Sequence, residues 1–324
     1  MFICMDLSPC LNGIGFIGGL QELPVHRLRF FKKKGSLCFL YDRRGGVLMG
    51  VVGIGTETYC YLCGLSVSHP VSLSDDVVIL PANSKFEAKD VSEKIKSDID
   101  LSVVVLSAPT IVSQMKITAT DSKHLAINAH NSQWDCFLLG AILDCDIMFN
   151  LQSDKPIEQA SESRYINITN YNFHGILHEV YHLSTEDEEW IKTNYNRASI
   201  LLDNDLFSTA IHSMASYRWH TLPRVQLAII WSGIEALFKI ESEISFRLSL
   251  YVAKFLGEND INKEKELFCR VRNLYNMRSA AVHGGKIKGD SIALVSESAS
   301  ILNCLIRRCS ELGHIPDVDE LLFN

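Results

Sequence analysis

The stretch KEKELFCRVRNLYNMRSAAVH, residues 263–283, is followed directly by Gly284 and Gly285. Its apolar residues stand at positions 267, 268, 271, 274, 275 and 282, a spacing typical of one face of a helix. Glycine after the last apolar position is a normal helix stop, and a histidine in the last turn complements the carbonyl end of the helix dipole. The sequence therefore predicts a long amphipathic helix that ends near His283.

Arg278 and His283 allow a second, functional interpretation of this helix end. An arginine can bind phosphate and a histidine exchanges protons near neutral pH, so the pair suits metal-free phosphoryl transfer. In an ideal helix, residues five apart point about 140° away from each other. The two side chains can therefore converge only if the helix ends here, or if two copies of the motif face one another.

Helical patterns surround this stretch from residue 184 onward. Thr185–Glu188 (TEDE) has the composition of a capping box, and Pro223 stands early in the first turn of a later helix. Helices are predicted from 185 through Leu201, at 207–219, from 221, and at about 243–256, 262–283 and 290–311. The sequence thus predicts an all-α helical bundle over 184–324, with the tail after Pro316 on its outside.

Residues 1–183 have a different pattern, which predicts an α+β domain. Strand signals occupy 36–41, 47–52, 58–62, 76–80 and 101–106, and RRGG at 43–46 predicts a hairpin between the first two. A polar, helix-compatible connection covers 89–99, and 111–175 mixes strands with one or two helices. The chain is therefore expected to hold two domains, 1–183 and 184–324, and the role of the first is open.

Three segments of the predicted bundle resemble a known family. They are RVQLAIIWSGIEALF (224–238), EISFRLSL (243–250) and YNMRSAAVH (275–283). In this order and spacing they resemble the Apea-like branch of the HEPN superfamily, whose members carry an R-x4-6-H motif in an all-helical bundle. The resemblance covers roughly residues 184–315, and the N-terminal part resembles nothing that we recognise.

The resemblance implies a metal-independent endoribonuclease that uses no cofactor. It implies an RNA substrate, with tRNA as a candidate, a homodimer formed through the bundle, and a place in bacterial antiphage defence or a toxin system. Arg278 would stabilise the phosphate and His283 would act as acid and base, with Tyr275 and Ser279 supporting them. Many active members carry Asn, Asp or His directly after the arginine, where this chain has Ser279. A non-catalytic dimerising or ligand-binding bundle is the alternative.

Glu235 is the acidic residue of the predicted bundle whose helical position most clearly predicts burial. It falls in the same helical row as Ala228, Trp231 and Phe238, so the sequence predicts that it is at least partly buried. A buried carboxylate is costly unless it is paired. Arg247 and Arg278 are its natural partners, either in an ordinary structural ion pair or in an arrangement that orients Arg278.

A zinc hydrolase is the third possibility, because His178-Glu179-Val180-Tyr181-His182 matches the H-E-x-x-H motif. On a helix the two histidines would share a face and Glu179 would be the general base. A zincin helix normally continues past its second histidine, whereas here a new helix start follows at once at Ser184. Plain amphipathic packing therefore remains the favoured interpretation.

Other motifs favour structural explanations. The glycines of GIGFIG at 13–18 lack room for the helix that a dinucleotide site needs, since Pro24 follows closely. Cys60 and Cys63 would point to opposite faces of a strand. The basic residues at 27–44 favour a solvated hairpin face over a phosphate site.

The composition indicates a soluble cytoplasmic protein. The 324 residues carry a net charge of −7, which argues against a broad nonspecific coat of nucleic acid. Ten scattered cysteines without a signal peptide indicate reduced thiols. The apolar run at 134–143 is too short to span a membrane, so no membrane partner is expected.

Overall fold

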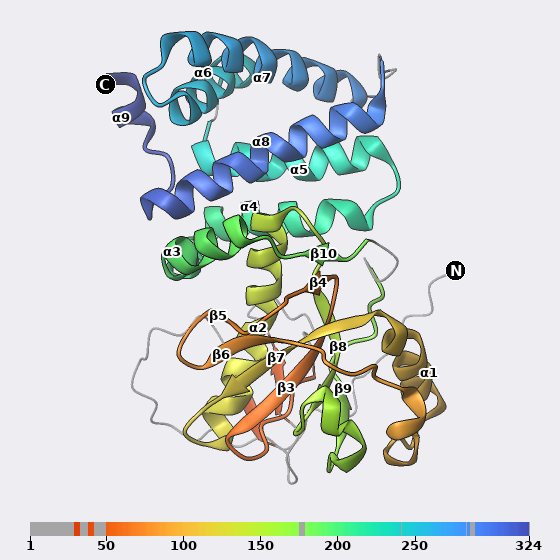
Figure 1. Cartoon of the computed structure of the whole chain (residues 1–324). Helices are drawn as coiled ribbons and strands as arrows, with labels where there is room; N and C mark the ends of the chain where they lie inside the picture. The colour runs from red at the N-terminus through yellow and green to blue at the C-terminus, as the bar shows by residue number, and fades with distance from the viewer. Residues whose placement is uncertain are drawn as a thin grey trace.

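The computed structural model describes residues 29–32, 38–41, 50–174, 179–240, 242–282, 284–285 and 289–323. These residues form a mixed α/β region followed by an all-helical region (Figure 1). The strands are β1 (Arg29–Lys32), β2 (Cys38–Tyr41), β3 (Glu57–Cys63), β4 (Leu65–Ser66), β5 (Val71–Ser72), β6 (Val77–Pro81), β7 (Ile111–Thr118), β8 (Met148–Ser153), β9 (Ile166–Ile168) and β10 (Tyr181–His182). The coarse prediction, an α/β part followed by a helical part, is confirmed.

The first region is built on a six-stranded antiparallel sheet with the order β5-β6-β7-β3-β8-β9. Because alternate side chains of a strand point to opposite faces, β3 contributes to two separate cores. Cys60 and Leu62 face one core, while Tyr59, Tyr61 and Cys63 face the other. The expected separation of the two cysteines to opposite faces is therefore confirmed.

One helix covers each face of this sheet (Figure 1). Helix α1 (Asp98–Ser107) places Val103 and Val104 against Tyr61 and Leu151 on the first face. Helix α2 (Ser122–Leu143) covers the other face and packs Leu125 and other apolar residues into the larger core. Short 3-10 helices η2 (Ala88–Asp90), η3 (Ser92–Lys94), η4 (Ala108–Thr110) and η5 (Ile157–Glu162) complete this region.

Helix α2 also enters the helical region, where it stands upright between the sheet and the helices in Figure 1. The larger core is continuous from the sheet through α2 into the bundle. Asn303 donates to the backbone oxygens of Ala141 and Ile142, at 2.7 and 2.9 Å, and so satisfies carbonyls at the end of α2. The hydroxyl of Tyr195 donates to Asp135 on α2 over 2.6 Å. The two regions therefore share one interior.

The helical region contains α3 (Thr185–Leu201), α4 (Asp205–Ser216), η6 (Tyr217–Trp219), α5 (Pro223–Phe238), α6 (Ile244–Gly257), α7 (Ile261–Val282), α8 (Ser291–Leu312) and α9 (Val318–Phe323). The helices lie in layers above the sheet, with α3 and α4 nearest to it and α6 and α7 farthest away (Figure 1). The oxygen of Ser184 accepts the amide of Asp187, so the capping box begins one residue before the expected Thr185.

The predicted strand at 101–106 is wrong, because this segment lies within α1. Three consecutive valines favour a strand in isolation, but Ser97 caps a helix by accepting the Asp100 amide. Burial of Val103 and Val104 against the sheet then determines the structure.

The predicted hairpin around residues 43–46 lies mostly outside the described residues. Strand β2 pairs with β1, which precedes it, and residues 50–52 are not in a strand. Residues 42–49 lie outside the described residues. The predicted strand at 36–41 therefore corresponds to β2, and its predicted pairing with residues 47–49 falls outside the described residues.

The boundary expected at 183/184 falls between β10, which pairs in parallel with β4, and the start of α3. Among the described residues no helix has both the length and the apolar character that crossing a membrane requires.

Candidate functional site

Arg278 lies in the last two turns of α7 and faces Glu235 on α5. Its Nη2 atom is 3.3 Å from Glu235 Oε1, with 15% of the arginine side chain and 31% of the glutamate side chain exposed. The predicted ion pair is therefore present, and Glu235 is partly buried as expected. The pair joins two helices that are separated in the chain by α6.

Two aromatic side chains complete the surroundings of Arg278. The guanidinium carbon lies 5.5 Å from the ring centroid of Tyr275, one turn earlier on α7. The Tyr275 ring packs edge-on against Trp231, with centroids 5.3 Å apart. Trp231 in turn donates its indole N–H to the hydroxyl of Ser298 on α8 over 3.1 Å. Arg278 is thus supported by contacts that reach three helices.

The electrostatics of the cluster are set by burial and by the carboxylate. Desolvation raises the pKa of Tyr275, the negative charge of Glu235 raises it further, and Arg278 opposes both effects. Tyr275 is consequently a neutral hydrogen-bond donor at physiological pH. Sequence reasoning named Tyr275 but missed Trp231 and Ser298, although Trp231 shares the helical row used to place Glu235.

The hydrogen-bonding capacity of the pair is only partly used. Glu235 Oε1 and Arg278 Nε are both buried and have no hydrogen-bond partner among the described residues. The 3.3 Å approach is long for a charge-assisted hydrogen bond, which is usually below about 2.9 Å. Arg278 therefore keeps donors that could serve a phosphate oxygen after a small rearrangement.

The end of α7 has the expected glycine cap. Gly284 adopts a φ of +86° and donates to Ala281, while the amide of Gly285 donates to Ala280 over 2.8 Å. This pair of bonds is the Schellman motif, in which a left-handed residue terminates the helix. Helix α7 ends at Val282, directly before His283, so the condition that the helix must end at this point is met. His283 itself lies outside the described residues.

Arg247 is not a partner of Glu235. Its Nε lies 3.3 Å from Glu243, four residues earlier, and both side chains are exposed. Glu243 directly precedes α6, so this acid at the helix start is within reach of Arg247 one turn later. Ser279 is half-buried and makes no side-chain hydrogen bond within the part of the chain that the structure describes.

The H-E-x-x-H segment is not a zincin helix. Glu179 and Val180 are not helical, and Tyr181 and His182 form strand β10. The amide of Tyr181 donates to Gly64 over 2.8 Å, so pairing with β4 fixes an extended backbone at Tyr181 and His182 in place of the helix that a zincin site needs. His178 lies outside the described residues, and within them no group of three or more His, Cys, Asp or Glu side chains is arranged to hold a metal ion.

Among the described residues, the remaining sequence motifs form no candidate site. The glycine run at 13–18 and the side chains of the basic residues at 27–44 lie outside the described residues. Cys60 and Cys63 are buried, and desolvation raises the pKa of both thiols, that of Cys63 to about 11. Neither thiol is therefore activated as a nucleophile or metal ligand.

Comparisons of the chain with protein-family models, with curated proteins and with solved structures gave no match. The cluster around Arg278 is accordingly interpreted from its own geometry.

Proposed function

We propose that the chain is a metal-independent endoribonuclease of the HEPN type. The observation that carries this proposal is the arginine near the end of α7, paired with Glu235 and followed at the helix stop by a histidine in the sequence. Five basic residues along α7 (Lys263, Lys265, Arg270, Arg272 and Arg278), with Lys286 and Lys288 just beyond it, favour a local polyanion site on an otherwise acidic protein.

The proposed reaction uses the nucleophile that RNA itself provides. The 2′-oxygen attacks the adjacent phosphorus while its proton passes to a base, and the bond from phosphorus to the 5′-oxygen breaks. The leaving oxygen takes up a proton, which gives a 2′,3′-cyclic phosphate and a 5′-hydroxyl. His283 would exchange these protons near neutral pH. Arg278 would stabilise the charge that develops on the phosphorane oxygens.

In this proposal the neighbours of Arg278 orient it rather than react. Glu235 holds one end of the guanidinium, and Tyr275 limits its movement from the other side. Ser279, which follows the arginine on α7, would contact the RNA backbone through its hydroxyl.

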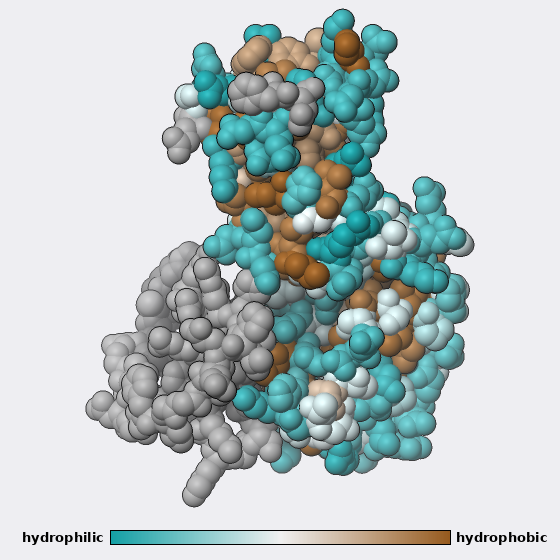
Figure 2. Space-filling view, turned by 90° about the vertical axis from the view of Figure 1, so that its left-hand side faces the viewer, coloured by the Kyte–Doolittle hydropathy of each residue, from teal (hydrophilic) through white to brown (hydrophobic). Residues whose placement is uncertain are grey.

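A homodimer would bring two copies of the motif together. Hydrophobic residues are visible on the surface of the helical region in Figure 2. The exposed large apolar side chains of this region include Phe246 on α6, Val282 at the end of α7 and Ile292 at the start of α8. Burial of such side chains would favour association through the bundle. Bacterial antiphage defence or a toxin system is the biological setting that the family resemblance suggests.

The decisive experiment is cleavage of total RNA and tRNA by the purified chain in EDTA. Wild type should cut and leave 2′,3′-cyclic phosphate ends, and Arg278→Ala and His283→Ala should each lose at least about a hundredfold in rate. Arg197→Ala, an exposed arginine on α3 outside the proposed RNA-binding helix, is the matched control and should retain activity. Cleavage that requires added metal, or that survives both site variants, would rule out this mechanism.

The low exposure of Arg278 favours a second candidate, a non-catalytic binding or dimerising bundle. In that case Arg278 and Glu235 would form only a structural ion pair. Wild type would then leave RNA intact under all conditions tested, and Arg278→Ala would lower the unfolding midpoint while changing no activity. Light scattering of the same samples would show whether the bundle assembles.

A further inference from the structure

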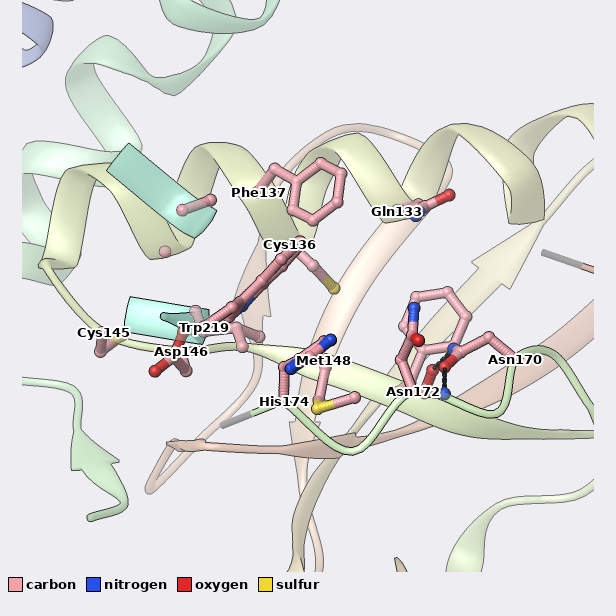
Figure 3. Close-up of a pocket in the computed structure, with 14 residues that line it drawn as sticks. Gln133, Cys136, Phe137, Cys145, Asp146, Met148, Asn170, Asn172, His174 and Trp219 are labelled. Carbon is pink, nitrogen blue, oxygen red and sulfur yellow. Dashed lines mark hydrogen bonds between the residues drawn. The ribbon is translucent and has the colours of Figure 1, made fainter. Parts of the chain in front are cut away.

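A cavity of about 150 Å³ lies where the sheet, α2 and the helical region meet (Figure 3). It is lined from α2, from β8 and the residues just before it, from the segment 170–174, and from the end of the α4–η6 unit. A cavity of about this size holds one benzene ring in a protein interior. The cavity therefore has room for a small planar ring, and it is far from the proposed nuclease cluster in the chain.

Aromatic side chains form one wall of this cavity. The His174 and Trp219 rings are stacked, with centroids 5.1 Å apart and planes 14° from parallel. Phe137 lies beside Trp219, with centroids 6.2 Å apart. Figure 3 shows Trp219, His174 and Phe137 around the same space, although they come from three separate segments. Flat aromatic walls favour planar ligands, because stacked or tilted rings attract one another.

Two carboxamides provide a polar edge to the cavity. The side chains of Gln133 and Asn172 line it, and neither has a hydrogen-bond partner within the described part of the chain. Each carboxamide presents a donor beside an acceptor, an arrangement that pairs with adjacent acceptor and donor atoms on a heterocyclic ring.

The segment that carries Asn172 is held in place. Asn170 accepts the backbone amide of Asn172 over 2.9 Å and donates to the carbonyl of Phe149 over 2.8 Å. Asn150, buried in β8, donates to the backbone oxygen of Asn172 over 2.6 Å. The backbone of Asn172 is therefore held by the sheet before any ligand arrives, so less of this segment must be ordered on binding and the entropy cost is lower.

The charge of the lining excludes anionic ligands. Of the described residues, no lysine or arginine lines the cavity, while Asp146 does. Cys136, which also lines it, is buried, and desolvation raises the pKa of its thiol well above the usual value, so it is neutral. A phosphate or carboxylate would find no countercharge here.

We propose that this cavity binds the ring of a nucleobase, taken as the free base or nucleoside. The ring would lie against Trp219 and His174, and its hydrogen-bonding edge would face Gln133 and Asn172. The proposal does not depend on ribonuclease activity. Since the lining joins the sheet to the helical region, the ligand would stabilise the contact between them.

Calorimetric titration of the full-length protein with adenine, guanine, cytosine and uracil tests the proposal. At least one base should bind with a dissociation constant of about 1 mM or tighter, given the affinity that ten or so ligand atoms can provide. Gln133→Leu and Asn172→Leu should each weaken binding about three- to tenfold, and Trp219→Leu by about tenfold or more. Asn196→Leu removes an exposed amide elsewhere, on α3, and should bind as wild type does.

Further titrations distinguish whether the ligand is a free base, a nucleoside or a nucleotide. The nucleoside of the best base should bind within a few-fold of that base, whereas its 5′-monophosphate should bind at least about tenfold more weakly. The unfolding midpoint of each variant without ligand verifies that it is folded. Absence of binding to wild type up to about 10 mM, preference for the monophosphate, or variants that bind as wild type does would each overturn the assignment.

Discussion

At the scale of single residues, Glu235 and Asp135 are two acids with opposite electrostatic situations. Glu235 lies 3.3 Å from Arg278, which offsets the cost of its partial burial. Asp135 on α2 accepts a hydrogen bond from Tyr195, but no cation among the described residues offsets its desolvation, which raises its pKa to about 6. The first acid is therefore a candidate for function and the second for a dependence of stability on pH.

Replacing Glu235 with Gln tests whether this carboxylate orients Arg278 for catalysis. Glutamine keeps the shape but removes the charge, so Arg278 should lose its fixed position, and ribonuclease kcat should fall about tenfold. The free energy of unfolding should fall by only about 0.5–1 kcal/mol, since a third of the side chain is in solvent. Single-turnover kinetics and urea denaturation measure the two effects. An unchanged rate with reduced stability would assign Glu235 a structural role only.

Asp135 should make the protein less stable as the pH rises from about 4 to about 6. In that window the folded state keeps the proton that the unfolded state, with a pKa near 3.8, has released. The free energy of unfolding should fall by up to about 3 kcal/mol over this range and should not fall further at higher pH. Asp135→Asn should remove this dependence and be more stable than wild type at pH 7. The exposed Asp75→Asn is the control, and identical pH profiles for both variants would contradict the assignment.

At the scale of elements, the helix stop after α7 depends on Gly284. Gly284→Ala should cost about 1 kcal/mol, because a Cβ is unfavourable at a φ of +86° even though the space around it is open. Gly284→Asn should cost less, since asparagine tolerates the left-handed region. Urea unfolding of the three proteins measures the difference. Equal stability of the alanine variant and wild type would show that the cap contributes nothing.

The helices and the cavity show which structural features the sequence predicts and which it does not. The bundle helices were predicted well, because helical spacing and terminal glycines are local signals. Helix α1 was missed because its valines favour a strand, and the decisive contacts come from a sheet outside the segment. The partial burial of Glu235 followed from one helical row, whereas the choice between Arg247 and Arg278 as its partner depended on how three helices pack. The cavity combines four distant segments, so no local pattern could have indicated it.

At the scale of the whole molecule, the shared core predicts one unfolding transition. Helix α2 packs on the sheet and on the bundle, and Asn303 bonds two of its last carbonyls. Thermal unfolding followed by far-UV and near-UV circular dichroism should therefore give coincident curves. Asn303→Ala should lower stability by about 1–2 kcal/mol and keep the curves coincident. Two separate transitions in wild type would show that the regions are independent.

The place of α2 in the chain has a consequence for folding during synthesis. The face of α2 that the bundle covers leaves the ribosome with residues 122–143, but α8, from which Asn303 bonds to the end of α2, is completed only at Leu312. At a usual elongation rate, the ribosome needs roughly ten to thirty seconds to make the intervening chain. During that interval α3 and α4 can pack on α2, but the part of its face that α8 covers stays exposed in the nascent protein. We therefore expect chaperones that bind exposed apolar segments to associate with ribosomes that have passed α2 and not yet reached the end of α8.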